Sequence, residues 1–223
     1  MSITAAKHTS KKGIRPLPLF AAIGAAFVAA TSALPLIAHA QGMTDKQMIE
    51  QLLGKTSRGA SQLAPAKSLN PSETSRLRAL LDKASTRAFS AKERTEVAEA
   101  VKDRPSLDFE IYFPFNSSSV QKTAEPTLQK IGQILTNEAF QDRGFLIAGH
   151  TDAKGRPEAN QIVSQRRADS VKAYLIKHFN IDPARLRVIG YGKEQLKDQG
   201  EPFASINRRV QIINLPDGAI ASR

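Results

Sequence analysis

A change of residue pattern at Pro105 constrains the fold of this 223-residue chain more than any other feature. Beyond it, apolar residues occupy every second position from Leu107 to Phe113. This period of two is typical of a β-strand that buries one face. The residues upstream show no such alternation, so we expect a separate domain to begin at residue 106 and to extend to residue 223.

The rest of this second half alternates between helical and extended patterns. Helical spacing over residues 124–135 precedes a compact apolar strand at 145–148, and a long helix is predicted from about residue 160 to 178. Short strands are predicted at 186–189 and 210–213. The order β-α-β-α-β-β predicts an α+β sandwich, in which helices pack on one face of a four-stranded sheet.

Residues 1–40 have the pattern of a secretory signal peptide. Basic residues between Lys7 and Arg15 precede an apolar run at 17–38, and Ala38-His39-Ala40 has the small-x-small form of a cleavage site. The apolar run approaches the ~20 residues that span a bilayer, so a retained inner-membrane anchor is the alternative. Cleavage predicts a periplasmic protein.

Residues 41–105 are predicted to form short helices joined by polar segments, with a linker at 54–71. Three helix starts carry a capping pattern, in which a side-chain acceptor is followed three residues later by Glu or Gln: Thr44 with Gln47, Asn70 with Glu73, and Ser90 with Glu93. The apolar stripes of these helices are narrow, so they need another surface to pack against. We assign this region no role, and an envelope protein is its candidate partner.

Composition excludes several classes of function. The chain has no cysteine, which removes disulfides, thiolate zinc sites, thiol nucleophiles and a lipidated-cysteine anchor. Its net charge of +11 is spread without a polybasic block and only 6% of residues are aromatic, which argues against nucleic-acid binding. Beyond residue 40 the histidines are His150 and His178, too few for a zinc site. We therefore predict neither a metal nor a cofactor.

The polar segment 149–160 is the strongest candidate for a binding site. It follows a predicted strand and leads into a helix, a position at which ligands bind. Arg167 lies on the apolar stripe of that helix, where its guanidinium needs a partner, and its side chain leans back toward Asp152 and Asn160. Two interpretations stay open, an internal pair between Asp152 and Arg167 or a site for a charged ligand.

Residues 107–214 resemble OmpA-like peptidoglycan-binding domains. The resemblance rests on Gly149-His150-Thr151-Asp152, Gly155, Asn160, Ser164, Arg167-Ala168, Val171, Arg185-Leu186, Gly190-Tyr191-Gly192 and Asn207-Arg208-Arg209-Val210. It implies a sheet of strand order 1-4-2-3 with the fourth strand antiparallel to the others. It also implies noncovalent binding of the diaminopimelate residue in peptidoglycan stem peptides.

The resemblance assigns roles to four residues. Asp152 would bind the ammonium of diaminopimelate and Arg167 its carboxylate, while Asn160 and Arg208 occupy family positions that line the same pocket. Strand alternation places Arg208 on the face of Val210 and Ile212. Arg209 should point the other way.

One position departs from the family pattern. Pro114 stands where many members carry an acidic residue. Asn116 could supply a neutral acceptor there instead, or it could be a turn residue.

The sequence thus predicts a binding protein and not an enzyme, attached to the cell wall from the periplasm, and leaves an association with the outer membrane open. One alternative is a membrane-anchored subunit similar to the peptidoglycan-binding partner of a flagellar stator, although residues 17–38 lack the intramembrane Asp that such a subunit needs. The third interpretation is a wall hydrolase that uses His150 and Asp152.

Overall fold

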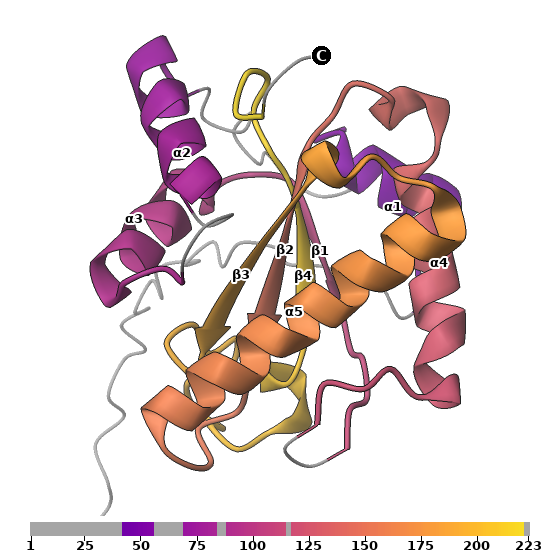
Figure 1. Cartoon of the computed structure of the whole chain (residues 1–223). Coiled ribbons are helices and arrows are strands. Elements are labelled where there is room, and N and C mark those ends of the chain that lie inside the picture. Colours follow the sequence, from indigo (N-terminus) through magenta and orange to yellow (C-terminus); the bar gives the residue numbers. More distant parts are fainter. Residues whose placement is uncertain (1–41, 56–68, 84–87, 115–116, 221–223) are drawn as a thin grey trace, which may run out of the picture. The chain divides into compact units, whose positions relative to one another are not determined.

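The computed structural model describes residues 42–55, 69–83, 88–114 and 117–220. The predicted signal peptide, most of the predicted linker and Asn116 lie outside the described residues. In chain order the elements are α1 (Asp45–Leu52), α2 (Pro71–Lys83), α3 (Ala91–Val101), β1 (Ser106–Phe109), α4 (Glu125–Leu135), β2 (Phe145–His150), α5 (Pro157–Phe179), β3 (Leu186–Gly192) and β4 (Val210–Asn214) (Figure 1).

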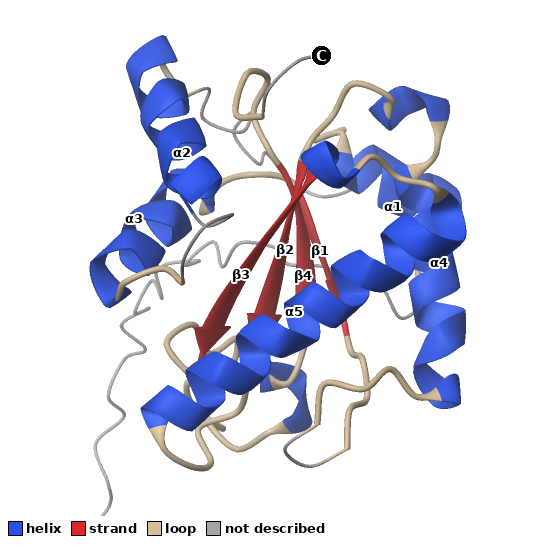
Figure 2. Ribbon diagram, in the orientation of Figure 1, coloured by secondary structure: helices blue, strands red, loops and turns tan. Residues whose placement is uncertain are grey.

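The four strands form one mixed sheet of order β1-β4-β2-β3 (Figure 2). Strand β4 is antiparallel to both of its neighbours, whereas β2 and β3 are parallel. The α+β class, the strand order and the direction of the fourth strand are therefore confirmed. Because β1 and β2 both run antiparallel to β4, the loops that follow β1 and β2 meet the start of β4 at the same end of the sheet.

The local signals upstream of the sheet are confirmed as helix starts. Thr44 and Ser90 each form a reciprocal capping box with the residue three positions on. Asn70 does the same with Glu73, whose main-chain nitrogen donates to Asn70 Oδ1 over 2.8 Å. The first strand is shorter than the alternation predicts, since its pairing with β4 ends at Phe109. Ile111 and Phe113 are buried as the alternation predicts, but they lie beyond the strand.

Helices cover both faces of the sheet, and not one face as the element order predicts, because α2 and α3 from upstream of residue 106 pack on the second face. Met48 and Leu52 of α1 join α4, α5 and alternate strand residues in one apolar core. Leu77 and Leu81 of α2, with Val97 of α3, join the opposite strand positions in a second core. The narrow stripes upstream of residue 106 thus find their packing surface on the sheet itself.

Helix α5 crosses the sheet at close range (Figure 1). A Cβ atom at Gly149 would overlap the main-chain oxygen of Ser164, and one at Gly190 would overlap the main chain of Gln165. Side chains of α5 also form hydrogen bonds with main-chain groups of the edge strand β3, since Gly192 N donates to Ser164 Oγ over 2.8 Å. This contact fixes the start of α5 beside the end of β2, where the candidate site lies.

Candidate functional site

Two loops and helix α5 bring the charged residues together at the end of the sheet where β1 and β2 end and β4 begins. Asp152 follows β2 by two residues, and Arg208 precedes β4 by two. A main-chain hydrogen bond joins the end of β2 to the start of β4, in which His150 N donates to Arg209 O over 3.0 Å. Arg167 reaches the same region from the third turn of α5.

Asp152 is engaged through both of its carboxylate oxygens. Its Oδ2 lies 2.9 Å from Nη1 of Arg208, and its Oδ1 accepts a hydrogen bond of 3.1 Å from the main-chain nitrogen of Lys154. The side chain of Asp152 is 15% exposed, against 46% for Arg208. The carboxylate is therefore a fixed, partly sheltered anion, and its partner is an open surface arginine.

Arg167 is held by the loop that follows β1. Its Nε donates to Ser117 O over 3.0 Å, and its Nη2 to Pro114 O over 3.4 Å. The guanidinium carbon also lies 5.0 Å from the centre of the Phe113 ring, within the range of a cation–π contact. These neutral partners orient Arg167, and no carboxylate of the described residues is in direct contact with its guanidinium.

The electrostatic state of Arg167 reflects its neighbours. Burial lowers the pKa of its guanidinium, the nearby charge of Arg208 lowers it further, and Asp152 opposes both effects. Arg167 nevertheless stays a cation at neutral pH, because a guanidinium gives up its proton only in strongly basic solution. The site therefore holds two cations and one anion, and Arg167 is available to a ligand carboxylate.

Pro114 takes a definite part in this arrangement. The main-chain carbonyls of Pro114 and Ser117 accept hydrogen bonds from Arg167 at the position where an acidic side chain was expected from the family pattern. A carbonyl accepts a hydrogen bond without carrying a full charge. Sequence reasoning missed Ser117 because nothing in the local pattern of residues 117–119 shows which long-range partner it has.

Asn160 is buried and organises the loop from within. Its Nδ2 donates to Lys154 O over 2.9 Å, which closes the turn that contains Asp152. Asn207 has a similar role on the other side, because its Oδ1 accepts hydrogen bonds from the main-chain nitrogens of Lys197 and Asp198, at 2.8 and 2.9 Å. Both amides fix the backbone that presents a charged residue.

His150 lies on the opposite face of the sheet. It is buried beside Tyr191, with 5.4 Å between the ring centres. On the same face Asp108 is buried between Arg209, at 3.3 Å, and Lys197 Nζ, at 2.7 Å. His150 therefore does not face the site, and the hydrolase interpretation loses its pairing of His150 with Asp152.

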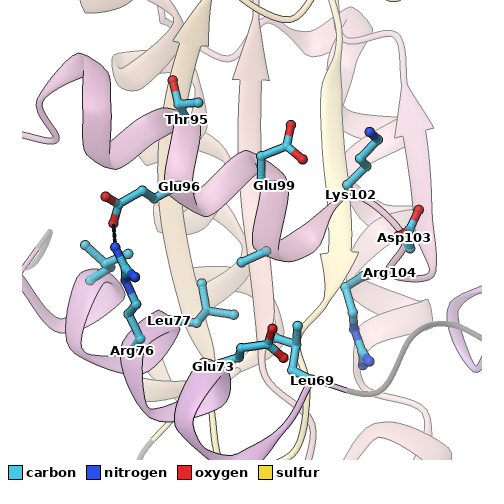
Figure 3. A pocket seen from close by; sticks show the side chains of 12 residues that line it. Leu69, Glu73, Arg76, Leu77, Thr95, Glu96, Glu99, Lys102, Asp103 and Arg104 are labelled. Carbon is cyan, nitrogen blue, oxygen red and sulfur yellow. Dashed lines mark ion pairs between the residues drawn. The ribbon is translucent and has the colours of Figure 1, made fainter.

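A separate groove of about 520 Å³ lies between α2 and α3 (Figure 3). Its wall includes an ion pair of 3.0 Å between Arg76 and Glu96, and its floor includes Leu77. Asp152, Asn160, Arg167 and Arg208 do not line it. The groove is thus distinct from the candidate site.

Among residues 42–55, 69–83, 88–114 and 117–220, no group of three or more acidic or histidine side chains is placed to hold a metal ion. No helix within those same ranges combines the length and the apolar character needed to cross a membrane.

The sequence model of the OmpA family matches residues 112–209, the segment that contains every residue of the site just described. This segment is an OmpA-family domain. The chain is 35% identical to a peptidoglycan-associated lipoprotein of Buchnera aphidicola over 46% of its own length and 59% of that relative's. It is 28% identical to outer membrane protein Omp38 of Acinetobacter baumannii over 47% of its length and 30% of that protein's.

Solved structures show related chains. The crystal structure of the peptidoglycan-associated lipoprotein from Burkholderia pseudomallei is 30% identical, with a TM-score of 0.39 over 50% of this chain and 89% of that one. The chain spans 59% of the length of the Buchnera lipoprotein and 30% of the length of Omp38. Its helices α1–α3 lie upstream of the family match.

Proposed function

We propose that this chain binds peptidoglycan noncovalently through the diaminopimelate residue of its stem peptides, and that it attaches a periplasmic envelope protein to the cell wall. In this proposal Asp152, Arg167, Asn160 and Arg208 form the binding pocket. The proposal needs no catalytic residue, metal or cofactor. The observation that carries it is a fixed carboxylate and an oriented, partly buried arginine at one edge of an OmpA-family domain.

The chemistry of diaminopimelate matches this arrangement. The free end of its side chain carries an ammonium and a carboxylate on one carbon, so a site that recognises it needs both an anion and a cation. Asp152 supplies the anion. Arg167 supplies a planar guanidinium that can grip a carboxylate through two parallel hydrogen bonds.

The proposed location in the cell envelope rests on the names of the related proteins and on the composition of this chain. The related proteins include peptidoglycan-associated lipoproteins and outer membrane proteins. The 223 residues contain no cysteine that could carry a lipid, so we propose that the wall contact itself retains this protein. The predicted signal peptide at residues 1–40 is part of this proposal, as is an envelope protein partner for residues 41–105.

Cosedimentation of the purified protein with isolated sacculi tests the proposal. We expect Arg167→Ala to weaken binding roughly ten- to a hundredfold, since a hydrogen bond between charged groups contributes about 1.5–3 kcal/mol. Arg167→Lys should also bind weakly, because an ammonium lacks the two-pronged geometry of a guanidinium. A double change of Asp152 and Arg167 to Ala should cost less than the sum of the two single changes.

Arg166→Ala is the matched control. Arg166 precedes Arg167 on α5, its side chain is exposed, and its loss changes the net charge by the same amount. Thermal unfolding of each variant verifies that it is folded. Equal loss of binding in Arg166→Ala and Arg167→Ala would mean that only bulk positive charge matters, and the proposed pocket would be wrong.

A further inference from the structure

Asp152, the anion that a ligand ammonium would need, is already paired with Arg208. Asp152 Oδ2 contacts Arg208 at 2.9 Å, while its Oδ1 is already held by the main chain of Lys154. A cation that approaches Asp152 must therefore displace Arg208 or share the carboxylate with it. In the free protein, Arg208 thus neutralises the charge of Asp152.

The two arginines differ in how firmly they are held. Arg167 has two main-chain acceptors and an aromatic ring around it. Arg208 is 46% exposed, and Asp152 is the only side chain with which it shares a recorded ion pair among the described residues. Arg208 is therefore the group that can turn away while Asp152 and Arg167 stay in place.

The backbone beneath Arg208 is fixed although its side chain is open. Its main-chain nitrogen donates to Ser205 O over 2.8 Å. The next residue, Arg209, is buried against Asp108 on the opposite face of the sheet. A change of partner at Arg208 thus needs a rotation of one side chain and no movement of β4.

We infer that Arg208 is an internal counter-ion of Asp152 that a ligand ammonium must displace, and that this exchange makes the site select ligands with a free carboxylate beside the ammonium. The inference rests on the proposed function and adds a specificity-determining residue to it. A zwitterionic ligand gives its ammonium to Asp152 and its carboxylate to the released Arg208 and to Arg167. Opposite charges then alternate across the site.

A ligand that brings only an ammonium meets a different balance. Lysine, or diaminopimelate whose side-chain carboxylate is amidated, would place a third cation beside Arg167 and Arg208 around the single carboxylate of Asp152. Like charges at this range repel, and burial strengthens the repulsion. Arg208 therefore penalises these two ligand types more than it penalises the zwitterion.

Calorimetric titration of the full chain with three soluble stem tripeptides tests the inference. The tripeptides carry diaminopimelate, amidated diaminopimelate or lysine at the third position. We expect the unmodified protein to prefer the first. In Arg208→Ala the affinity for the lysine peptide should rise, and the preference for diaminopimelate over lysine should fall at least tenfold.

Three further variants make the experiment decisive. Arg208→Gln, which keeps a hydrogen-bond donor without the charge, should lose the preference as Arg208→Ala does, whereas Arg208→Lys should retain most of it. Arg156→Ala is the control for bulk charge, since Arg156 is a largely exposed cation at the start of α5 and its removal should leave the preference unchanged.

The possible outcomes separate this inference from the proposed function. If the unmodified protein binds the diaminopimelate peptide but Arg208→Ala keeps the full preference, the role of Arg208 is refuted and the proposed function stands. If Arg156→Ala lowers the preference as much as Arg208→Ala, selection comes from overall charge and the inference fails. If the unmodified protein binds neither the peptides nor sacculi, the proposed function fails first.

Discussion

Two consecutive arginines at the start of β4 face opposite sides of the sheet. Arg208 lies in the open with Asp152, whereas Arg209 is buried and paired with Asp108. Strand alternation predicts this separation, and the structure confirms it. The buried pair anchors the strand, and the open pair is free to exchange partners.

His150, behind the site, gives a prediction about pH. Burial lowers its pKa well below the usual 6.5, and the charge of Arg209 lowers it further, with Lys197 adding to the same effect. The folded protein thus keeps His150 neutral while the unfolded chain takes up a proton near pH 6.5. The stability that this preference contributes is present above pH 6.5 and is lost as the pH falls below it.

Urea unfolding at several pH values measures this effect. Between about pH 7.5 and pH 5.5 the free energy of unfolding should fall, because the unfolded chain takes up a proton that the buried imidazole of His150 does not. His150→Phe, which keeps an aromatic ring beside Tyr191, should remove that part of the pH dependence. The exposed His178 is the control, and an unchanged slope in His150→Phe together with a flatter one in His178→Gln would contradict the assignment.

At the scale of elements, the contact between α5 and the sheet positions the site. The helix lies so close to β2 and β3 that Gly149 and Gly190 have no room for a side chain. The polar residues of α5 that face β3 satisfy main-chain groups of this edge strand, with Gln161 Nε2 donating to Gly190 O over 2.7 Å. Any shift of α5 would move Arg167 away from its carbonyl partners.

Gly190→Ala tests this packing. The added methyl group would overlap the backbone of Gln165, which cannot yield as a flexible side chain would. We expect a loss of about 1–3 kcal/mol in the free energy of unfolding. Gly200→Ala is the control, because its nearest neighbour is a side-chain oxygen of Asp198 at 3.3 Å, and equal effects of the two changes on urea unfolding would contradict the close-packing argument.

The elements differ in how much of them the sequence predicts. Capping boxes and strand alternation act over a few residues, so the starts of α1 and α3 and the face of Arg208 follow from local patterns. The start of α5 was expected near residue 160, but Pro157 begins the helix, as proline often does at a first helical position. The partners of Arg167 were not predictable, because Ser117 lies fifty residues away and on another element.

At the scale of the whole molecule, the upstream helices complete the two cores of the domain. Leu77, Leu81 and Val97 are almost fully buried against the face of the sheet that holds Leu146 and Ile213. The buried Arg94 of α3 adds an ion pair with the partly exposed Glu194, in which its Nε donates to Oε2 over 2.8 Å. The sequence could not show this packing, because a narrow apolar stripe on a helix does not determine which surface it packs against.

The division of the chain at residue 106 stays a prediction, and a comparison of the fragments 42–223 and 106–223 tests it. All four proposed pocket residues lie in the shorter fragment, so we expect it to bind sacculi when folded. Its free energy of unfolding should nevertheless be several kcal/mol lower, because each large apolar side chain that α2 and α3 bury contributes about 1.5–3 kcal/mol. The uncovered sheet face should also bind a hydrophobic dye.

Leu81→Ala in the longer fragment isolates the contribution of α2 without removing any chain. Leu81 is fully buried, so the change should cost about 2–5 kcal/mol and should increase dye binding in the same direction as truncation does. Ser72→Ala, at an exposed position at the start of α2, should change neither quantity much. If truncation and Leu81→Ala both leave stability unchanged, α2 and α3 do not stabilise the sheet, and their packing against it has no energetic role. If truncation instead abolishes wall binding in a fragment that remains folded, the upstream helices belong to the binding surface and the boundary at residue 106 is wrong.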